Sequence, residues 1–302
     1  MQQHTFNRID ICMGWLAFAI ALVVYGTSVE PTASLWDCPE FIASGYRLEI
    51  GHPPGAPFFM LTANLFSHLA ATPSQVALMV NLMSALLSAG CILFLFWTIT
   101  HFARKLIVTD GTYTRERVLL IESCGLVGAL AYAFSDTFWF SATEAEVYAY
   151  SSFLTAVVFW LMLKWEEEAD CARSSRWLIL IAYLIGLSIG VHLLNLLCIP
   201  AMVLVFCFRR SERAGFWGIL LALTISAAIV ALVLYGIIPG VVWLAGLFEL
   251  FFVNVCSLPY HSGLLCLVLL MLVGLPVCIW HSRNRAARVC LLSLSMLLLG
   301  YS

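Results

Sequence analysis

The chain has 302 residues, of which 62% are hydrophobic and 11% are charged. Soluble domains carry roughly 25% charged residues and about 45–50% apolar ones, so this composition excludes a water-soluble protein. The mean hydropathy of +0.97 agrees and indicates a membrane protein with many spans. The 15 basic and 17 acidic residues leave a net charge of −2, which offers no basic field and excludes nucleic acid as a partner. The eleven cysteines fall mostly within apolar runs, so we predict no disulfides and no CxxC metal site.

Nine apolar runs predict nine helical spans, because a bilayer core about 30 Å thick needs roughly 20 apolar residues per helix. The nine runs cover residues 11–29, 75–102, 118–134, 147–165, 177–191, 193–208, 216–238, 261–280 and 289–302. The first run lacks a small-residue cleavage site and predicts an uncleaved span. Residues 1–302 are therefore expected to form one all-α transmembrane domain, and the apolar end of the chain predicts a piece of a longer protein.

The basic residues orient these spans, because loops rich in Lys and Arg stay on the cytoplasmic side. With a cytoplasmic amino terminus, all basic residues but Arg47 fall on that side. They are Arg8, Arg104, Lys105, Arg115, Arg117, Lys164, Arg173, Arg176, Arg209, Arg210, Arg213, Arg283, Arg285 and Arg288. Residues 58–70 are too short to cross and predict a helix in the membrane interface, inside a long non-cytoplasmic loop of residues 30–74. The spans 177–191 and 193–208 are short and nearly contiguous, which predicts a tight hairpin.

Eight acidic residues lie outside the cytoplasm in this topology. They are Glu30, Asp37, Glu40, Glu49, Asp136, Glu144, Glu146 and Glu249. An ionisable group at the bilayer midplane costs on the order of 2.5–3.5 kcal/mol, so acids beside spans are functional candidates. Three short segments hold most of them.

The first segment contains Asp37, Pro39 and Glu40, a few residues beyond the first span. Asp followed three residues later by Glu, with Pro inside the first turn, is typical of a capped helix start in which Glu40 reaches back. The functional interpretation makes Asp37 a general base in a partly desolvated site. The two interpretations are compatible, since a capping carboxylate still lies at a helix mouth.

The second segment is a run of three prolines and two glycines around His52, residues 51–57. It predicts a rigid turn that enters the interfacial helix. His52 and Arg47 add a cationic pair among many carboxylates, which is what a phosphate-bearing substrate needs.

The third segment is the outer loop of residues 135–146. Thr143 and Glu146 fit a capping box that opens the fourth span, which leaves Glu144 unexplained. Two carboxylates at this spacing can share a hard divalent cation such as Mg²⁺ or Mn²⁺, the only cofactor we consider. His192 and Asn195 lie at the tip of the predicted hairpin, on the same side. Tryptophans on that side, Trp36, Trp139 and Trp243, are interpreted first as interface aromatics.

Three motifs together resemble one family. They are PTASLWDCPEFIASGYRLEIGHPPGAP over residues 31–57, FWFSATEAEVYAYS over residues 138–151 and GVHLLNLL over residues 190–197. They resemble the family known as domain of unknown function 2723, whose animal relatives are transmembrane protein 260 type protein O-mannosyltransferases. The resemblance covers residues 8–208. Pro39 stands where the family usually has a glycine, while the Asp and Glu of that motif are kept.

The resemblance implies a glycosyltransferase of the C fold, a polytopic helical bundle with a long first non-cytoplasmic loop. Such an enzyme takes a sugar from a polyprenyl-phosphate-linked donor and acts outside the cytoplasm, in the bacterial inner membrane or the endoplasmic reticulum. The catalytic acid maps onto Asp37, with Glu40 beside it, and the acidic pair of the second outer loop maps onto Glu144 and Glu146.

These parts predict an inverting transfer of a mannose-like sugar to Ser or Thr hydroxyls of exported proteins, with Asp37 as the base. We expect the lipid phosphate to be bound by Arg47, His52, His192 and Asn195, and a divalent cation to bind Glu144 and Glu146. The expected partners are the lipid-linked sugar, the exported acceptor and membrane lipids. A transporter or flippase of a lipid-linked substrate, and an inactive scaffold subunit that binds lipid carriers, stay open as alternatives.

Overall fold

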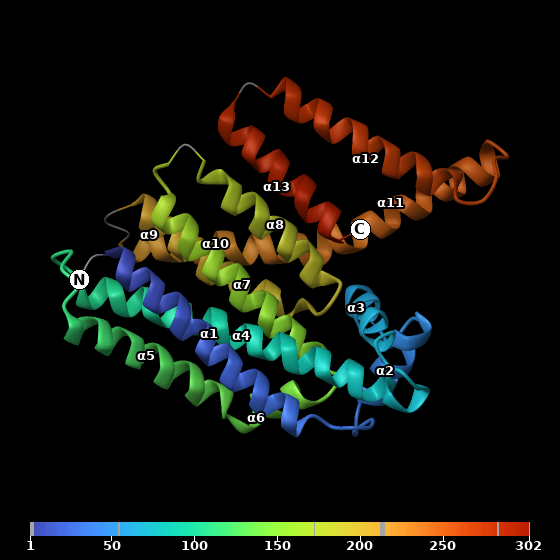
Figure 1. Ribbon diagram of the computed structural model, residues 1–302. Coiled ribbons are helices and arrows are strands. Elements are labelled where there is room, and N and C mark those ends of the chain that lie inside the picture. The colour runs from blue at the N-terminus through green and yellow to red at the C-terminus, as the bar shows by residue number, and fades with distance from the viewer. Residues whose placement is uncertain (1–2, 54, 172, 212–214, 283, 302) are drawn as a thin grey trace. The chain divides into compact units, whose positions relative to one another are not determined.

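The computed structural model describes residues 3–53, 55–171, 173–211, 215–282 and 284–301, and these residues form helices joined by loops, with no strand among them (Figure 1). Pro54 of the proline-rich turn, and Arg213 and Arg283 of the predicted cytoplasmic loops, lie outside the described residues. The chain divides into two compact units. The first comprises Met1–Lys164, Leu187–Asn195 and Tyr301, and the second comprises Trp165–Gly186 and Leu196–Gly300.

The first unit is built around long apolar helices that lie side by side. They are α1 (Gln3–Ser28), α4 (Val76–Ile107), α5 (Arg115–Ala133) and α7 (Val147–Glu168), the last of which continues into the second unit (Figure 1). Small residues let these helices approach closely, as is usual in membranes. A Cβ atom on Gly90 would lie 2.7 Å from Phe153, and one on Gly125 would lie 2.6 Å from Thr100. The helix contacts of this unit therefore depend on residues that lack side-chain bulk.

A sharp break separates α5 from a short helix, α6 (Asp136–Thr143), and the two axes differ by 67°. The break leaves carbonyl groups at the end of α5 without helical partners. The buried Tyr25 hydroxyl donates to the carbonyl of Ala133 at 2.8 Å, and the Ser135 hydroxyl donates to the carbonyl of Tyr132 at 2.7 Å. These bonds stabilise the bend, after which residues 143 and 144 contact the loop of residues 30–74.

The loop of residues 30–74 contains two short helices, α2 (Cys38–Arg47) and α3 (Pro57–Ser67), followed by the 3₁₀ turn η1 (Pro73–Gln75). The two helices pack directly on each other, since a Cβ atom on Gly45 would lie 2.8 Å from Ala63. The Asn64 amide also donates to the carbonyl groups of Gly45 and Tyr46, at 3.1 and 3.0 Å. A helix was expected over residues 58–70, and α3 confirms a short one there.

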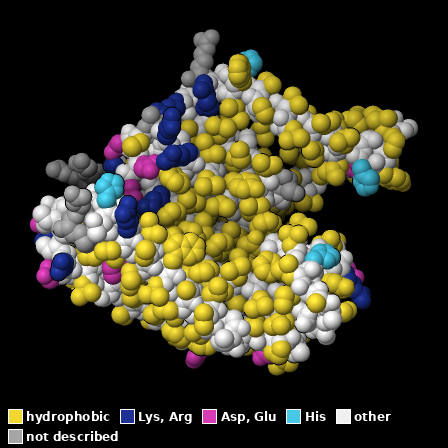
Figure 2. Space-filling view, viewed as in Figure 1, with side chains coloured by type: hydrophobic (Ala, Val, Ile, Leu, Met, Phe, Trp, Pro, Cys, Tyr) yellow, Lys and Arg dark blue, Asp and Glu magenta, His cyan; other side chains and the backbone are white. Residues whose placement is uncertain are grey.

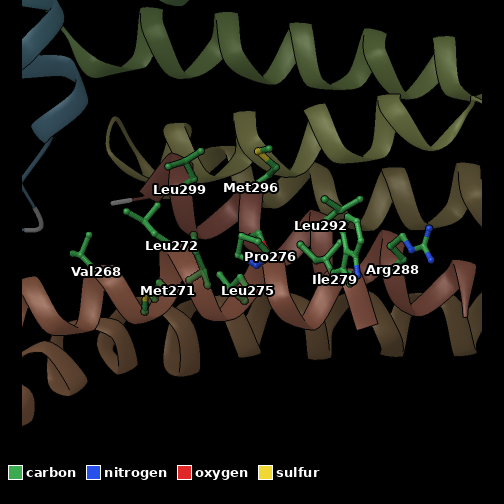
Figure 3. Close-up of a pocket in the computed structure, with 13 residues that line it drawn as sticks. Val268, Met271, Leu272, Leu275, Pro276, Ile279, Arg288, Leu292, Met296 and Leu299 are labelled. Carbon is green, nitrogen blue, oxygen red and sulfur yellow. The ribbon is translucent and has the colours of Figure 1, made fainter. Parts of the chain in front are cut away.

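The second unit contains the remaining helices. They are α8 (Ser175–Ile189), the 3₁₀ helix η2 (Leu193–Cys198, which begins in the first unit), α9 (Ile199–Arg210), α10 (Phe216–Ala231), η3 (Leu232–Ile237), α11 (Ile238–Leu250), η4 (Phe251–Val255), α12 (Ser262–His281) and α13 (Arg285–Tyr301). Helices α12 and α13 flank an apolar groove of about 690 Å³, with Arg288 at one end and Val268 towards the other (Figure 3).

One expected boundary in this unit is wrong. The sequence predicts a span over residues 216–238, but the helix continues for 40 residues, Phe216–Val255. Pro239 lies within this helix, although a proline in a helix interior lacks an amide proton and usually breaks the helix. The π-helical turn η3 precedes it, so Pro239 falls in the first turn of α11, where a missing proton costs little.

Six helices are long and apolar enough to cross a membrane, or seven if the bent pair α5 and α6 is one span. Figure 2 shows hydrophobic side chains over most of the visible surface, with few charged groups. The protein is therefore an all-α polytopic membrane protein. Helices lie at all nine predicted positions, but α8 has 15 residues and α13 has 17, fewer than the roughly 20 that a membrane span needs. The number of nine spans stays a prediction.

Candidate active site

Hydrogen bonds hold the segment before Asp37 against α4 and α6. The Glu30 amide donates to the carbonyl of Thr143 at 3.0 Å, and the Asn81 side chain donates to the carbonyl groups of Glu30 and Thr32 at 2.7 and 3.0 Å. Asn81 is fully buried in α4. The Ser34 hydroxyl donates to the carboxylate of Glu144. Two loops that are more than 100 residues apart in the chain are thus joined at the end of the first unit.

Asp37 begins α2 without capping it. The backbone has φ −84° and ψ −11°, and no amide of the helix donates to the carboxylate. Capping needs an extended conformation at this residue, so the helical one directs the side chain away from the amides. The capping interpretation of Asp37 is therefore wrong. Pro39 falls within the first turn, where proline is favoured.

Glu40 likewise does not reach back to Asp37. Its carboxylate accepts a hydrogen bond from the His52 amide at 2.6 Å and lies 3.1 Å from His52 Nδ1. These bonds to His52 hold the pKa of Glu40 below its ordinary value. The His52 ring also lies 5.7 Å from the ring of Phe41. These contacts of His52 hold the proline-rich turn against α2.

Asp37, Glu40 and His52 form a compact donor group. One ligand atom from each, two carboxylate oxygens and one imidazole nitrogen, lie within 4.8 Å of one another. Oxygen and nitrogen donors at this separation suit a divalent cation. The sequence prediction named only Glu144 and Glu146 for that role.

Glu144 and Glu146 are almost completely buried, at 2% and 7% exposure. Burial raises the pKa of both, and for Glu146 it does so to about 7, with the charges of Glu144 and Asp37 acting in the same direction. The expected capping box is wrong. Thr143 ends α6, and its hydroxyl donates to the carbonyl groups of Trp139 and Phe140 instead of capping α7.

Asp37, Glu144 and Glu146 share one open cavity of about 830 Å³. The residues that line it are Trp36, Asp37, Tyr132, Ser135, Asp136, Thr137, Phe138, Phe140, Ser141, Glu144, Glu146, Tyr148 and Ser152. The wall contains both carboxylates and aromatic rings. A site of this composition can bind hydroxyl groups through the acids and an apolar face through the rings.

The hairpin tip lies in the same unit. The carbonyl of Gly190 accepts from the Phe58 amide at 2.7 Å, which ties the tip to the start of α3. The His192 ring lies 5.3 Å from the ring of Tyr148, and burial lowers the pKa of this histidine. Asn195 is fully buried and accepts from the Thr155 hydroxyl at 3.0 Å. His192 therefore contacts the cavity wall, while Asn195 holds the tip against α7.

A family profile described as the N-terminal domain of the protein O-mannosyl-transferase TMEM260 matches residues 37–215. The chain belongs to this family. Two curated relatives named protein O-mannosyl-transferase TMEM260 are similar to it. The protein from Dictyostelium discoideum is 24% identical over 68% of the chain, and that from Mus musculus is 26% identical over 69%. The chain spans about a quarter of the length of these relatives, 24% and 28%. No solved structure matches the chain.

The family match begins at Asp37, but the expected partners of that residue are not all close to it. Arg47 lies at the opposite end of α2, roughly 15 Å along the helix axis, because each residue rises about 1.5 Å. Its guanidinium lies 3.7 Å from Glu49, and both side chains are mostly exposed. Arg47 and His52 thus face different carboxylates and do not form one pair.

Two residues that build the site were missed by sequence reasoning. Asn81 and Ser34 fasten the loop, yet neither was singled out. Asn81 did carry a signal, because an amide inside an apolar run is costly unless it has a partner. Ser34 carried none, since a serine in a polar loop is ordinary.

Proposed function

We propose that the chain is part of a protein O-mannosyltransferase that moves mannose from a polyprenyl-phosphate-linked donor to Ser or Thr hydroxyls of exported proteins. The family and the names of its two relatives support the activity. The observation that carries the proposal is the Asp37 carboxylate, which caps no helix and shares a cavity with Glu144 and Glu146. A glycosyltransferase C fold with about nine spans is part of the proposal.

In the proposed reaction, the acceptor hydroxyl attacks C1 of the sugar while the bond from C1 to the phosphate oxygen breaks. Asp37 takes the proton of the hydroxyl, and the polyprenyl phosphate leaves with the bonding electrons. One displacement of this kind inverts the configuration at C1. The transition state resembles an oxocarbenium ion, which nearby carboxylates stabilise.

The remaining residues hold the groups that react. His52 binds the phosphate, whereas Arg47, at the opposite end of α2, is not part of the phosphate site. Glu40 is a positioning residue because it acts through His52. His192 binds substrate at the cavity wall beside Tyr148, and Asn195 fixes the hairpin that carries His192. A divalent cation on Glu144 and Glu146 would neutralise charge on the leaving phosphate. By the distribution of basic residues, the site faces away from the cytoplasm.

Replacing Asp37 by Asn tests the proposal. We expect mannose transfer by the full-length protein to fall about a thousand-fold, since general bases contribute roughly that much, with donor-lipid binding unchanged. Asp110→Asn is the matched control, because Asp110 lies in a loop that carries none of the proposed site residues. Unchanged transfer in the Asp37 variant would show that Asp37 is not the general base. Movement of the lipid across the membrane without sugar transfer in the wild type would favour a flippase.

Chelation tests the cation. With EDTA we expect transfer to cease and to return when Mg²⁺ or Mn²⁺ is added in excess. Glu144→Gln should then raise the concentration of cation needed, whereas Glu40→Gln should not if the ion binds the acidic pair. Full activity in EDTA would leave Glu144 and Glu146 as positioning groups. A shift only in the Glu40 variant would instead move the ion to the donor group of Asp37, Glu40 and His52.

A further inference from the structure

Trp36 has an unusual backbone and an unusual exposure for a large aromatic residue. Its φ angle is +64°, in the left-handed region that residues with a Cβ avoid. Its side chain is 86% exposed, and it stacks on no other aromatic ring among the described residues. Packing within the protein therefore does not explain why the chain holds the indole in this position.

The turn that carries Trp36 is fixed on both sides. Before it, the Ser34 hydroxyl is bonded to Glu144 and the carbonyl of Thr32 accepts from Asn81. After it, Cys38 is fully buried at the start of α2. A disfavoured backbone that persists between such anchors is typical of functional sites, where the surrounding structure imposes it.

The surroundings of the indole indicate its ligand. Trp36 lines the same cavity as the carboxylates of Asp37, Glu144 and Glu146. A pyranose ring has one face rich in C–H groups, which carry slight positive charge and suit the negative face of an aromatic ring. Its hydroxyl groups donate to carboxylates. The exposed indole of Trp36 can therefore contact the C–H face of a hexose, while the carboxylates of the same cavity accept from its hydroxyl groups.

A tryptophan at the membrane interface is the competing explanation, and the chain offers a direct comparison. Trp280 is also 86% exposed, but it lies in the last turn of α12 with a regular helical backbone. It lines the apolar groove of the second unit, where Arg288 is the one charged residue. Exposure is thus shared by the two residues, whereas the left-handed turn and the neighbouring carboxylates belong to Trp36.

We propose that Trp36 is the stacking surface for the pyranose ring of the transferred sugar, held by its left-handed turn over the carboxylates of the cavity. This rests on the proposed function and adds to it the residue that recognises the hexose. The indole contacts the sugar and neither the lipid chain nor the phosphate.

Two lipids that differ only in the sugar test this assignment. Binding of mannosyl polyprenyl phosphate and of bare polyprenyl phosphate to the full-length protein is measured for the wild type, Trp36→Ala, Trp36→Gly, Trp36→Phe and Trp280→Ala. We expect Trp36→Ala to weaken binding of the mannosyl lipid about ten-fold and to leave binding of the bare lipid unchanged. Trp36→Gly relieves the backbone but should show the same loss, while Trp36→Phe retains most of the affinity. Trp280→Ala should change neither.

Equal weakening of both lipids by Trp36→Ala would make the residue a lipid or interface contact and would overturn the assignment, as would no change in either. If the wild type binds neither lipid, the proposed donor is wrong, and methyl α-mannoside then serves as the probe. Loss of its binding in Trp36→Ala but not in Trp280→Ala would still support sugar stacking. Equal binding in both variants would refute it.

Discussion

Among the residues that the structure describes, each unit contains a glutamate that accepts from a histidine amide, and the two pairs differ in their other contacts. In the first unit, Glu40 accepts from the amide of His52, twelve residues later. In the second, Glu249 accepts from the amide of His261, also twelve residues later. Glu249 additionally accepts from the amides of Gly263 and Leu264, each at 3.1 Å.

The two carboxylates differ in which groups donate hydrogen bonds to them. Glu249 binds three amides at the start of α12, which is what a helix amino terminus requires. Glu40 binds both the amide and the ring of His52, and it keeps that ring within ligand distance of Asp37. A carboxylate that accepts hydrogen bonds only from backbone amides stabilises the fold. A carboxylate that also contacts an ionisable side chain can set the position and the charge of that side chain.

Of the changes that bear on this comparison, Glu40→Gln should have the largest effect. The neutral amide bonds His52 weakly, so the imidazole loses its fixed position, and a displacement of about 1 Å can cost a hundred-fold in rate. We expect mannose transfer to fall by about that factor and the melting temperature to stay nearly constant, because Glu40 is partly exposed. Transfer assays and thermal unfolding of the same preparation measure both. A large loss of stability with normal transfer would make Glu40 structural like Glu249.

The loop around Asp37 shows which features could be predicted from the sequence. Residue type singled out Asp37, Glu40, Glu144 and Glu146, and the structure brings three of them, Asp37, Glu144 and Glu146, into one cavity. Hydropathy placed the helices around them. Both capping boxes were wrong, because a capping motif is defined by spacing while the cap depends on the backbone angle of its first residue. The segment that leads into Asp37 is held by hydrogen bonds to Asn81, Thr143 and Glu144, which the local sequence does not contain.

The second failure concerns α6 and the helix beyond Phe216. An apolar run shows that a helix exists but not where it bends or stops, since bends depend on partners such as the Tyr25 hydroxyl. In the second unit, a π turn allowed the helix to pass Pro239. Regions that follow one periodicity were predictable, and those decided by a distant hydrogen bond were not.

A smaller effect is expected from Asn81→Ala, which removes the hydrogen bonds that hold the segment before Asp37. Two carbonyl groups, of Glu30 and Thr32, would lose a buried donor, at about 1–3 kcal/mol each. We expect lower thermal stability and about ten-fold slower transfer as Asp37 loses its fixed place. Asn64→Ala is the matched control, because Asn64 also bridges two carbonyl groups but at the far end of α2. Equal losses in the two variants would show that the loop needs no anchor at Asn81.

The smallest effect on catalysis is expected from Glu249→Ala, which breaks the pairing in the second unit. The first amides of α12 lose their acceptor, which weakens the start of that helix. The melting temperature should fall by a few degrees, while transfer per folded molecule stays at the wild-type rate. Glu249→Gln should recover part of the stability, because its amide oxygen still accepts a hydrogen bond. If Glu249→Ala instead abolishes transfer without changing the melting temperature, the acid of the second unit contributes to the reaction, and the equal spacing of the two pairs reflects a shared role.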